Sequence, residues 1–204
     1  MITIVDYGMG HLHSVSKALE RLQFDTRVSA DPQTLLNSDG VILPGVGAFG
    51  DAMLELRRNR LDETLWEVSM RGIPLLGICL GMQLLFTESE EHGLHRGLNL
   101  LPGTVRRLKP GVKIPHIGWN ELTFVQPHTL FTGLSEGHVY FIHSYYVEIG
   151  NQEELLATTD YGGEVAAVVG RNRVFGMQFH PEKSGALGMT LLQKFAQLCQ
   201  KEKV

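Results

Sequence analysis

The chain has 204 residues, of which 43% are hydrophobic and 20% are charged, and its formal net charge is −4. This balance is typical of a globular protein and excludes a disordered or fibrous chain. The 18 Lys and Arg residues form no basic stripe that could neutralise nucleic-acid phosphates, so the sequence argues against a nucleic-acid partner.

The two cysteines, Cys79 and Cys199, are too few for a disulfide framework, and they favour a reducing, cytoplasmic location. The first residues lack a basic segment followed by a small-residue cleavage site, so we expect no signal peptide. No apolar run approaches the roughly 18 residues that span a bilayer, so we expect a soluble protein without a membrane partner. The length fits one domain over residues 1–204.

The first part of the chain alternates short apolar runs with helical patterns. The predicted strands cover residues 2–5, 41–43 and 74–78, and the helical patterns that follow them cover about 12–22, 50–70 and 80–87. Continuous apolar runs suit strands that are buried on both faces, as in a parallel sheet. This part therefore predicts an α/β fold with an open, mostly parallel central sheet flanked by helices.

From about residue 104 the pattern changes to short strands separated by turns. The predicted strands cover residues 104–108, 121–125, 139–142, 145–149, 164–169 and 174–179. Residues 170–173 are typical of a hairpin turn, and apolar residues at helical spacing predict a closing helix over 187–198. We interpret this strand-rich second half as completing the sheet of the same domain.

A candidate nucleophile lies in Gly77-Ile78-Cys79-Leu80-Gly81, where a predicted strand meets a predicted helix. On such a sharp turn the side chain stands clear of the sheet, and flanking glycines allow close packing. Unpaired N–H groups at the helix start favour the thiolate, and the Leu80 amide is free to donate to an oxyanion. A lone cysteine is more often a small buried residue, which is our interpretation of Cys199. The two glycines favour a nucleophile at Cys79.

A candidate base, His180, follows the predicted strand 174–179. Ligands of open α/β sheets lie beyond the carboxyl ends of strands, so His180 is expected to meet Cys79 there. Glu182 is near enough to accept a hydrogen bond from the imidazole and fix its tautomer. The other histidines lack partners at metal-ligand spacing, so we expect no metal. Gly8-Met9-Gly10 lacks the third glycine of a dinucleotide-binding fingerprint and is interpreted as a turn, and we expect no cofactor.

These motifs resemble those of the class I (triad) glutamine amidotransferases, over essentially the whole chain. The family's Gly-x-Cys-x-Gly and His-Pro-Glu match residues 77–81 and 180–182. The resemblance implies a glutamine amidotransferase domain that hydrolyses L-glutamine. It implies that Cys79 forms a γ-glutamyl thioester, that His180 is the general acid and base, and that Glu182 orients His180.

The same resemblance implies roles for residues around the triad. Gln83 matches the family glutamine that contacts the substrate side chain. Ser144 and Tyr145 match the segment whose backbone holds the substrate's α-amino and carboxylate groups, and Gly45 belongs to the implied substrate-binding set. The amide of Val46 would join that of Leu80 as an oxyanion donor. Because glycines flank Val46, a peptide flip in this loop carries no steric penalty. The hypothesis is that such a flip completes the oxyanion hole only when the partner is loaded.

Four stretches, 6–10, 44–50, 117–120 and 180–184, resemble one branch of the family, the glutaminase subunits of histidine biosynthesis. Members of that branch form a heterodimer with a cyclase subunit that resembles a (β/α)8 barrel. The cyclase uses the ammonia to make imidazole glycerol phosphate and the carboxamide AICAR. The likeness implies interface positions for Trp119, Asn120 and Lys183.

One departure concerns His11, which replaces the usual family Asn. Because Asn and neutral His both donate and accept hydrogen bonds, His11 can keep the family contact in an altered form. The replacement bears on the detail of signalling across the interface and not on the chemistry.

Two alternatives remain open. A stand-alone Cys-His-Glu hydrolase of γ-glutamyl peptides would need its own lid and no partner. A non-catalytic regulatory subunit could lose the nucleophile, whereas Cys79, His180, Glu182 and Gln83 are all present.

Overall fold

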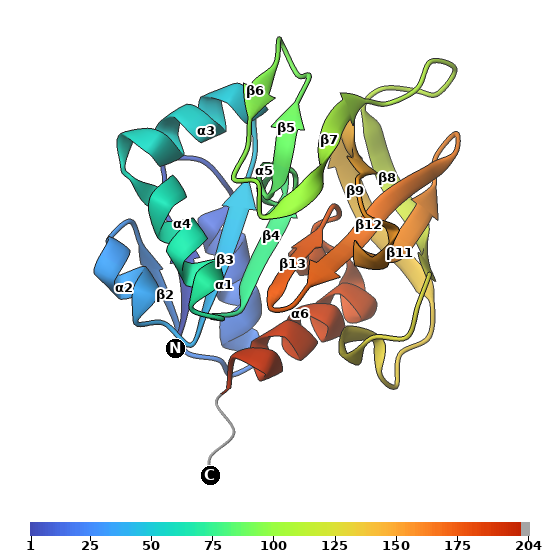
Figure 1. Ribbon diagram of the computed structural model, residues 1–204. Coiled ribbons are helices and arrows are strands. Elements are labelled where there is room, and N and C mark those ends of the chain that lie inside the picture. Colours follow the sequence, from blue (N-terminus) through green and yellow to red (C-terminus); the bar gives the residue numbers. More distant parts are fainter. Residues whose placement is uncertain (201–204) are drawn as a thin grey trace.

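The computed structural model describes residues 1–200 of the chain. Figure 1 shows a large twisted sheet with helices packed against it and a smaller sheet beside it. The helices are α1 (Leu12–Arg21), α2 (Pro32–Leu36), α3 (Phe49–Arg58), α4 (Leu61–Met70), α5 (Leu80–Leu84) and α6 (Gly185–Cys199). Three short 3-10 turns are η1 (Thr129–Phe131), η2 (Gln152–Glu154) and η3 (Pro181–Lys183).

The central sheet has nine strands in the order β2-β1-β3-β4-β13-β12-β11-β8-β9. Its parallel strands are β1 (Ile2–Val5), β2 (Thr26–Ser29), β3 (Gly40–Gly45), β4 (Leu75–Cys79) and β13 (Val174–Met177). Its antiparallel part continues with β12 (Glu164–Arg171), β11 (Leu155–Asp160), β8 (His116–Phe124) and β9 (Gly137–His143). The α/β class and the central sheet are confirmed. The sheet is mixed, because the strand-rich half joins it through the β12–β13 hairpin.

A second sheet has the order β10-β7-β5-β6. Its strands are β10 (Tyr145–Ile149), β7 (Leu101–Arg107), β5 (Phe86–Ser89) and β6 (His95–Arg96). The helix predicted over about 80–87 is wrong at its end, because α5 stops at Leu84 and Phe86 begins β5. The reason is tertiary: β5 pairs in parallel with β7, a contact that local periodicity does not show.

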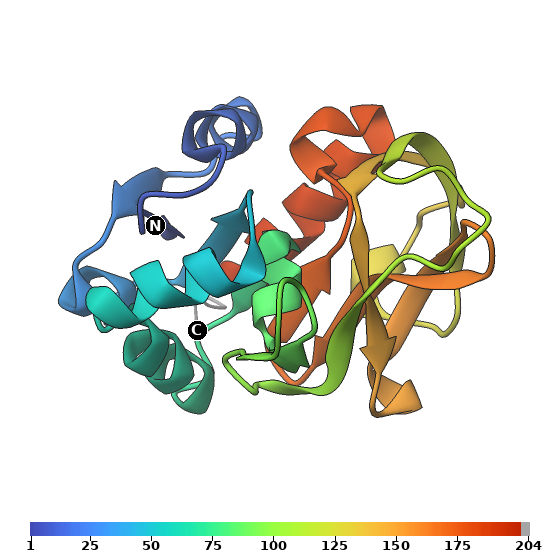
Figure 2. The same cartoon turned by 90° about the horizontal axis from the view of Figure 1, so that it is seen from above.

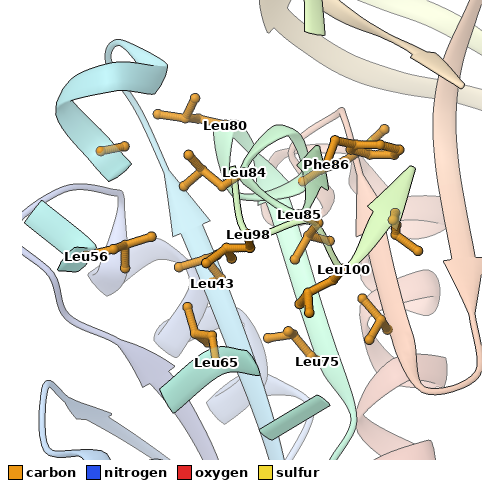
Figure 3. Close-up of a cluster of buried hydrophobic side chains, with 14 of the residues drawn as sticks. Leu43, Leu56, Leu65, Leu75, Leu80, Leu84, Leu85, Phe86, Leu98 and Leu100 are labelled. Carbon is orange, nitrogen blue, oxygen red and sulfur yellow. The ribbon is translucent and has the colours of Figure 1, made fainter. Parts of the chain in front are cut away.

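The two faces of the central sheet carry separate apolar cores. Strand β3 contributes Leu43 to one face and Ile42 to the other, as expected for alternating side chains. Helices α3, α4 and α5 cover the first face, and α1 and α6 cover the second, as the view from above shows (Figure 2). Figure 3 shows the first core, where leucines of β3, β4 and the helices meet those that lead into the smaller sheet. Burial of each such side chain contributes about 1.5–3 kcal/mol.

Several elements differ from the sequence prediction. The single helical pattern at about 50–70 is two helices, α3 and α4, because Arg60 between them is left-handed, with φ of 55°. Four helices and strands, β2, α2, β6 and β11, have no predicted counterpart, and neither have the three 3-10 turns. Among residues 1–200, no helix is long and apolar enough to cross a membrane.

Candidate active site

Cys79 ends β4 and directly precedes α5, with φ of 56° and ψ of −114°. A positive φ is strained for any residue with a Cβ and costs about 1–3 kcal/mol. The flanking glycines allow the turn because backbone segments approach there. A Cβ at Gly81 would overlap the carbonyl oxygen of Leu43, and one at Gly77 would lie 2.5 Å from the carbonyl oxygen of Gly81. The predicted strand–turn–helix geometry is therefore present at Cys79.

His180 lies beyond the carboxyl end of β13, the parallel neighbour of β4. Its Nδ1 is 2.9 Å from Oε1 of Glu182, and the two side chains are only 4% and 1% exposed. The turn is held by Ser184, whose hydroxyl donates to the carbonyl of His180 at 2.6 Å. Parallel strand order thus brings the histidine to the edge of the sheet where Cys79 lies.

Burial alone would lower the pKa of His180. Hydrogen bonds with Cys79 and Glu182, and the negative charge of both groups, outweigh burial and raise the pKa of His180 to about 9. The imidazolium form is therefore favoured at neutral pH, between a sulfur and a carboxylate. Such a group holds a proton ready for transfer beside the sulfur of Cys79.

A cavity of about 460 Å³ opens over Cys79. The sequence-predicted residues that line it are Val46, Cys79, Leu80, Gln83, Ser144, Tyr145, His180 and Lys183. His11 also lines it, with its ring 6.3 Å from that of His180. A larger hollow, about 770 Å³, lies near the start of β4 and the end of α6 and contains no predicted site residue.

Four predicted residues lie outside the cavity wall. Glu182 is behind His180, and Gly45 is buried at the end of β3, opposite Cys79 in the sheet register. A Cβ at Gly45 would lie 2.7 Å from the amide nitrogen of Gly81, so this glycine permits close packing under the turn. Trp119 and Asn120 are on β8, beyond the cavity.

The β8–β9 patch is an exposed apolar surface beside the cavity, formed by Ile117, Trp119, Tyr140 and Ile142. Ile117 faces Ile142 across the two strands, and Trp119 faces Tyr140. Ile117 and Trp119 are 55% and 54% exposed, while Tyr140 and Ile142 also line the cavity. Apolar side chains gathered next to a site typically mark a surface that a partner covers. Asn120 instead donates its side-chain amide to the carbonyl of Asp160 at 2.8 Å.

The sequence prediction missed Glu91, whose side chain is buried in the cavity wall. Its Oε2 accepts a hydrogen bond of 2.8 Å from the amide of Phe49, at the start of α3. Glu91 is the only carboxylate among the cavity-lining residues that the structure describes. No motif marks it, because the smaller sheet places it against the site only in the folded chain.

The fold and the cavity place the chain among α/β proteins that carry a cysteine on a strand–helix turn facing a histidine–glutamate pair. The family model described as glutamine amidotransferase class-I matches residues 3–198. The chain belongs to this family, and it is an enzyme of the glutamine amidotransferase class.

Relatives extend over the full chain. It is 55% identical over 207 residues to the imidazole glycerol phosphate synthase subunit HisH of Geobacillus sp. strain WCH70, covering 98% of each chain. It is 50% identical over 210 residues to the protein of that name in Bacillus subtilis strain 168, covering 100% of this chain and 99% of the relative. The finer resemblance noted in the sequence is therefore confirmed.

Solved structures share the fold at low identity. A crystal structure titled glutamine amidotransferase has a TM-score of 0.77 at 22% identity, covering 98% of this chain and 99% of that one. The structure of PurLQS from Thermotoga maritima has a TM-score of 0.75 at 18% identity, covering 98% of both chains.

Proposed function

We propose that the chain is the glutaminase subunit of imidazole glycerol phosphate synthase. It hydrolyses L-glutamine to glutamate and ammonia, and a cyclase subunit uses the ammonia to form imidazole glycerol phosphate and AICAR in histidine biosynthesis. The observation that carries the proposal is the strained Cys79 beside the buried His180–Glu182 pair at the cavity. Full-length identity of 50–55% to relatives named as this subunit supports the choice within the family.

In the proposed reaction, the Cys79 thiolate attacks the carboxamide carbon of glutamine. The negative oxygen that forms is held by the amides of Leu80, at the start of α5, and Val46, in the loop after β3. Each such donor contributes about 3 kcal/mol to lowering the barrier. His180, kept protonated by its raised pKa, gives a proton to the departing ammonia, which leaves a γ-glutamyl thioester on Cys79.

Hydrolysis of the thioester reverses these roles. His180, now neutral, takes a proton from a water molecule that attacks the thioester carbon. Glutamate is released and the thiolate is restored beside the imidazolium. Glu182 holds Nδ1 of His180 throughout, so that Nε2 is the nitrogen that serves Cys79 and the leaving group.

The rest of the cavity suits the other end of the substrate. Glutamine carries an α-ammonium group, and Glu91 offers a carboxylate to it. Ser144 and Tyr145 line the same cavity, and their backbone is proposed to hold the α-amino and carboxylate groups. Gly45 contributes by letting the oxyanion loop approach the turn at Cys79.

We propose that the partner is a cyclase subunit of the (β/α)8-barrel type and that it covers the β8–β9 patch. Lys183, exposed at the rim of the cavity, is proposed to pair with a carboxylate of that partner. The Val46–Gly47 segment is proposed to complete the oxyanion hole when the partner is loaded, because Gly47 already has a positive φ of 92°. A cytoplasmic location is proposed as well, and the free thiols of Cys79 and Cys199 support it.

The test is a glutaminase assay on the purified chain, alone and with a cyclase subunit carrying its nucleotide ligand. We expect slow hydrolysis alone and a rise on the order of 10²-fold in the loaded complex, the effect of one additional oxyanion donor. The Cys79→Ala variant should hydrolyse no glutamine, while ammonium salts should still support the cyclase. Full activity without the partner would favour a stand-alone hydrolase. A Cys79→Ala complex that turns over glutamine normally would refute the proposed nucleophile.

A further inference from the structure

The fully buried side chain of Gln178 lies between the nucleophile and the proposed substrate-binding glutamine. Its Nε2 is 3.9 Å from Sγ of Cys79. Its Oε1 accepts a hydrogen bond of 3.0 Å from Nε2 of Gln83. One primary amide therefore contacts both Cys79 and Gln83 from inside the core.

The direction of these hydrogen bonds is determined by the carbonyl of Tyr145, which can only accept. Nε2 of Gln83 lies 3.0 Å from that carbonyl, so the Gln83 nitrogen must face it. The second N–H of the same nitrogen then points to Gln178, which must present its oxygen there. The nitrogen of Gln178 is left facing Cys79, where a thiolate needs a donor.

The Tyr145 carbonyl has a second neighbour in His143, which is paired with another buried histidine, His116. Nδ1 of His143 lies 2.7 Å from that carbonyl and therefore carries a proton. Nε2 of His143 is 3.0 Å from Nδ1 of His116, whose ring is stacked on Tyr161. Burial lowers the pKa of both histidines to about 4, so both rings stay neutral near pH 7. Nδ1 of His143 then continues to donate to the Tyr145 carbonyl, and Nε2 of His143 accepts from Nδ1 of His116.

With both of its N–H groups occupied, Gln83 has only its oxygen left for a ligand in the cavity. An oxygen there accepts from the carboxamide NH₂ of glutamine and cannot be exchanged with the nitrogen unless the bonds to Gln178 and to the Tyr145 carbonyl both break. Resting on the proposed function, we propose that Gln178 is a positioning residue that donates to the Cys79 thiolate and fixes the amide of Gln83 with its oxygen toward the substrate.

The test replaces Gln178 with Met, which is similarly long and unbranched but has no donor. In the complex with the cyclase, we expect the KM for glutamine to rise about tenfold, because the Gln83 amide then keeps only one of its two hydrogen bonds, the one to the Tyr145 carbonyl. We expect the rate constant for alkylation of Cys79 by iodoacetamide at pH 7 to fall about fivefold, because a less stabilised thiolate is less populated.

Gln126 provides a matched control, because its Nε2 donates two hydrogen bonds to backbone carbonyls away from the cavity. Gln126→Met should affect the Tm but neither KM nor alkylation. Unchanged KM and alkylation in Gln178→Met, or changes equal to those of Gln126→Met, would overturn the proposal. The alkylation rate does not depend on turnover, so it tests Gln178 even if glutamine is not the substrate.

A measurement on the wild-type chain covers the case in which Gln178→Met does not fold. Alkylation of Cys79 removes the thiolate acceptor, so the side-chain ¹⁵N amide signal of Gln178 should shift while that of Gln126 stays in place. A Gln178 signal that does not move would overturn the proposal.

Discussion

Replacing Glu182 with Gln tests whether the buried carboxylate sets the proton affinity of His180. The Glu182 side chain is 1% exposed, and its Oε1 lies 2.9 Å from Nδ1 of His180. The substitution preserves the shape of the side chain, removes its negative charge and leaves one amide oxygen that can still accept from Nδ1 of His180. A hydrogen bond to a charged group is worth about 1.5–3 kcal/mol, which corresponds to about 1–2 pKa units. We therefore expect the pKa of His180 to fall from about 9 by that amount.

The same shift predicts how stability depends on pH. The pKa of His180 is raised in the folded chain from 6.5 to about 9, so the folded state binds the proton more tightly than the unfolded state. This contribution, about 3 kcal/mol in wild type, is fully present below pH 6.5 and is lost as the pH rises through about 9. The Glu182→Gln variant should be less stable by about 1.5–3 kcal/mol at pH 6, and the difference should shrink toward pH 9.

The assays are an NMR titration of the His180 ring and denaturant unfolding between pH 6 and pH 10. Glu154→Gln is a matched control, since Glu154 is a second buried carboxylate that pairs with Arg171 away from the cavity. It should change stability but leave the pKa of His180 unaltered. An unchanged His180 pKa in Glu182→Gln would show that the carboxylate does not set the proton affinity.

Three further predictions follow from the geometry. A glutamine-directed diazo ketone should alkylate Cys79 and spare Cys199, because burial raises the pKa of Cys199 to about 12. Peptide mapping that finds Cys199 labelled first would contradict this. Gly81→Ala should destabilise the chain by about 1–3 kcal/mol in denaturant unfolding, because its Cβ would overlap a backbone carbonyl. In the control variant Gly137→Ala, the new Cβ would lie 3.4 Å from its nearest neighbour, so the loss of unfolding free energy should be much smaller. Equal losses of unfolding free energy in the two variants would refute the packing argument. Lys183→Glu should weaken activation by the cyclase, measured as the ratio of glutaminase rates with and without the cyclase, and should leave alkylation of Cys79 unchanged. An unaltered ratio would show that Lys183 makes no interface contact that matters for activation.

The positions of Cys79 and His180 could be predicted because their signals are local. A buried strand followed by a helix, with glycines two residues before and after the cysteine, leaves few backbone geometries for Cys79. The apolar run before His180 is likewise a strand, and parallel strands bring their carboxyl ends to one edge. The hairpin turn at 170–173 is also a local signal, and β12 and β13 do pair there.

The α/β class, the turn at Cys79 and the histidine–glutamate pair can be predicted from the sequence, because periodicity and short-range spacing encode them. Which polar groups meet depends on the folded arrangement of distant segments. Glu91 reaches the cavity from the turn between β5 and β6, and Gln178 lies 95 positions after Gln83 in the chain. The strand β5, whose first two residues periodicity assigns to a helix, exists because β7 pairs with it. Hydrogen bonds between distant segments depend on long-range pairing, and no local pattern of residues specifies that pairing.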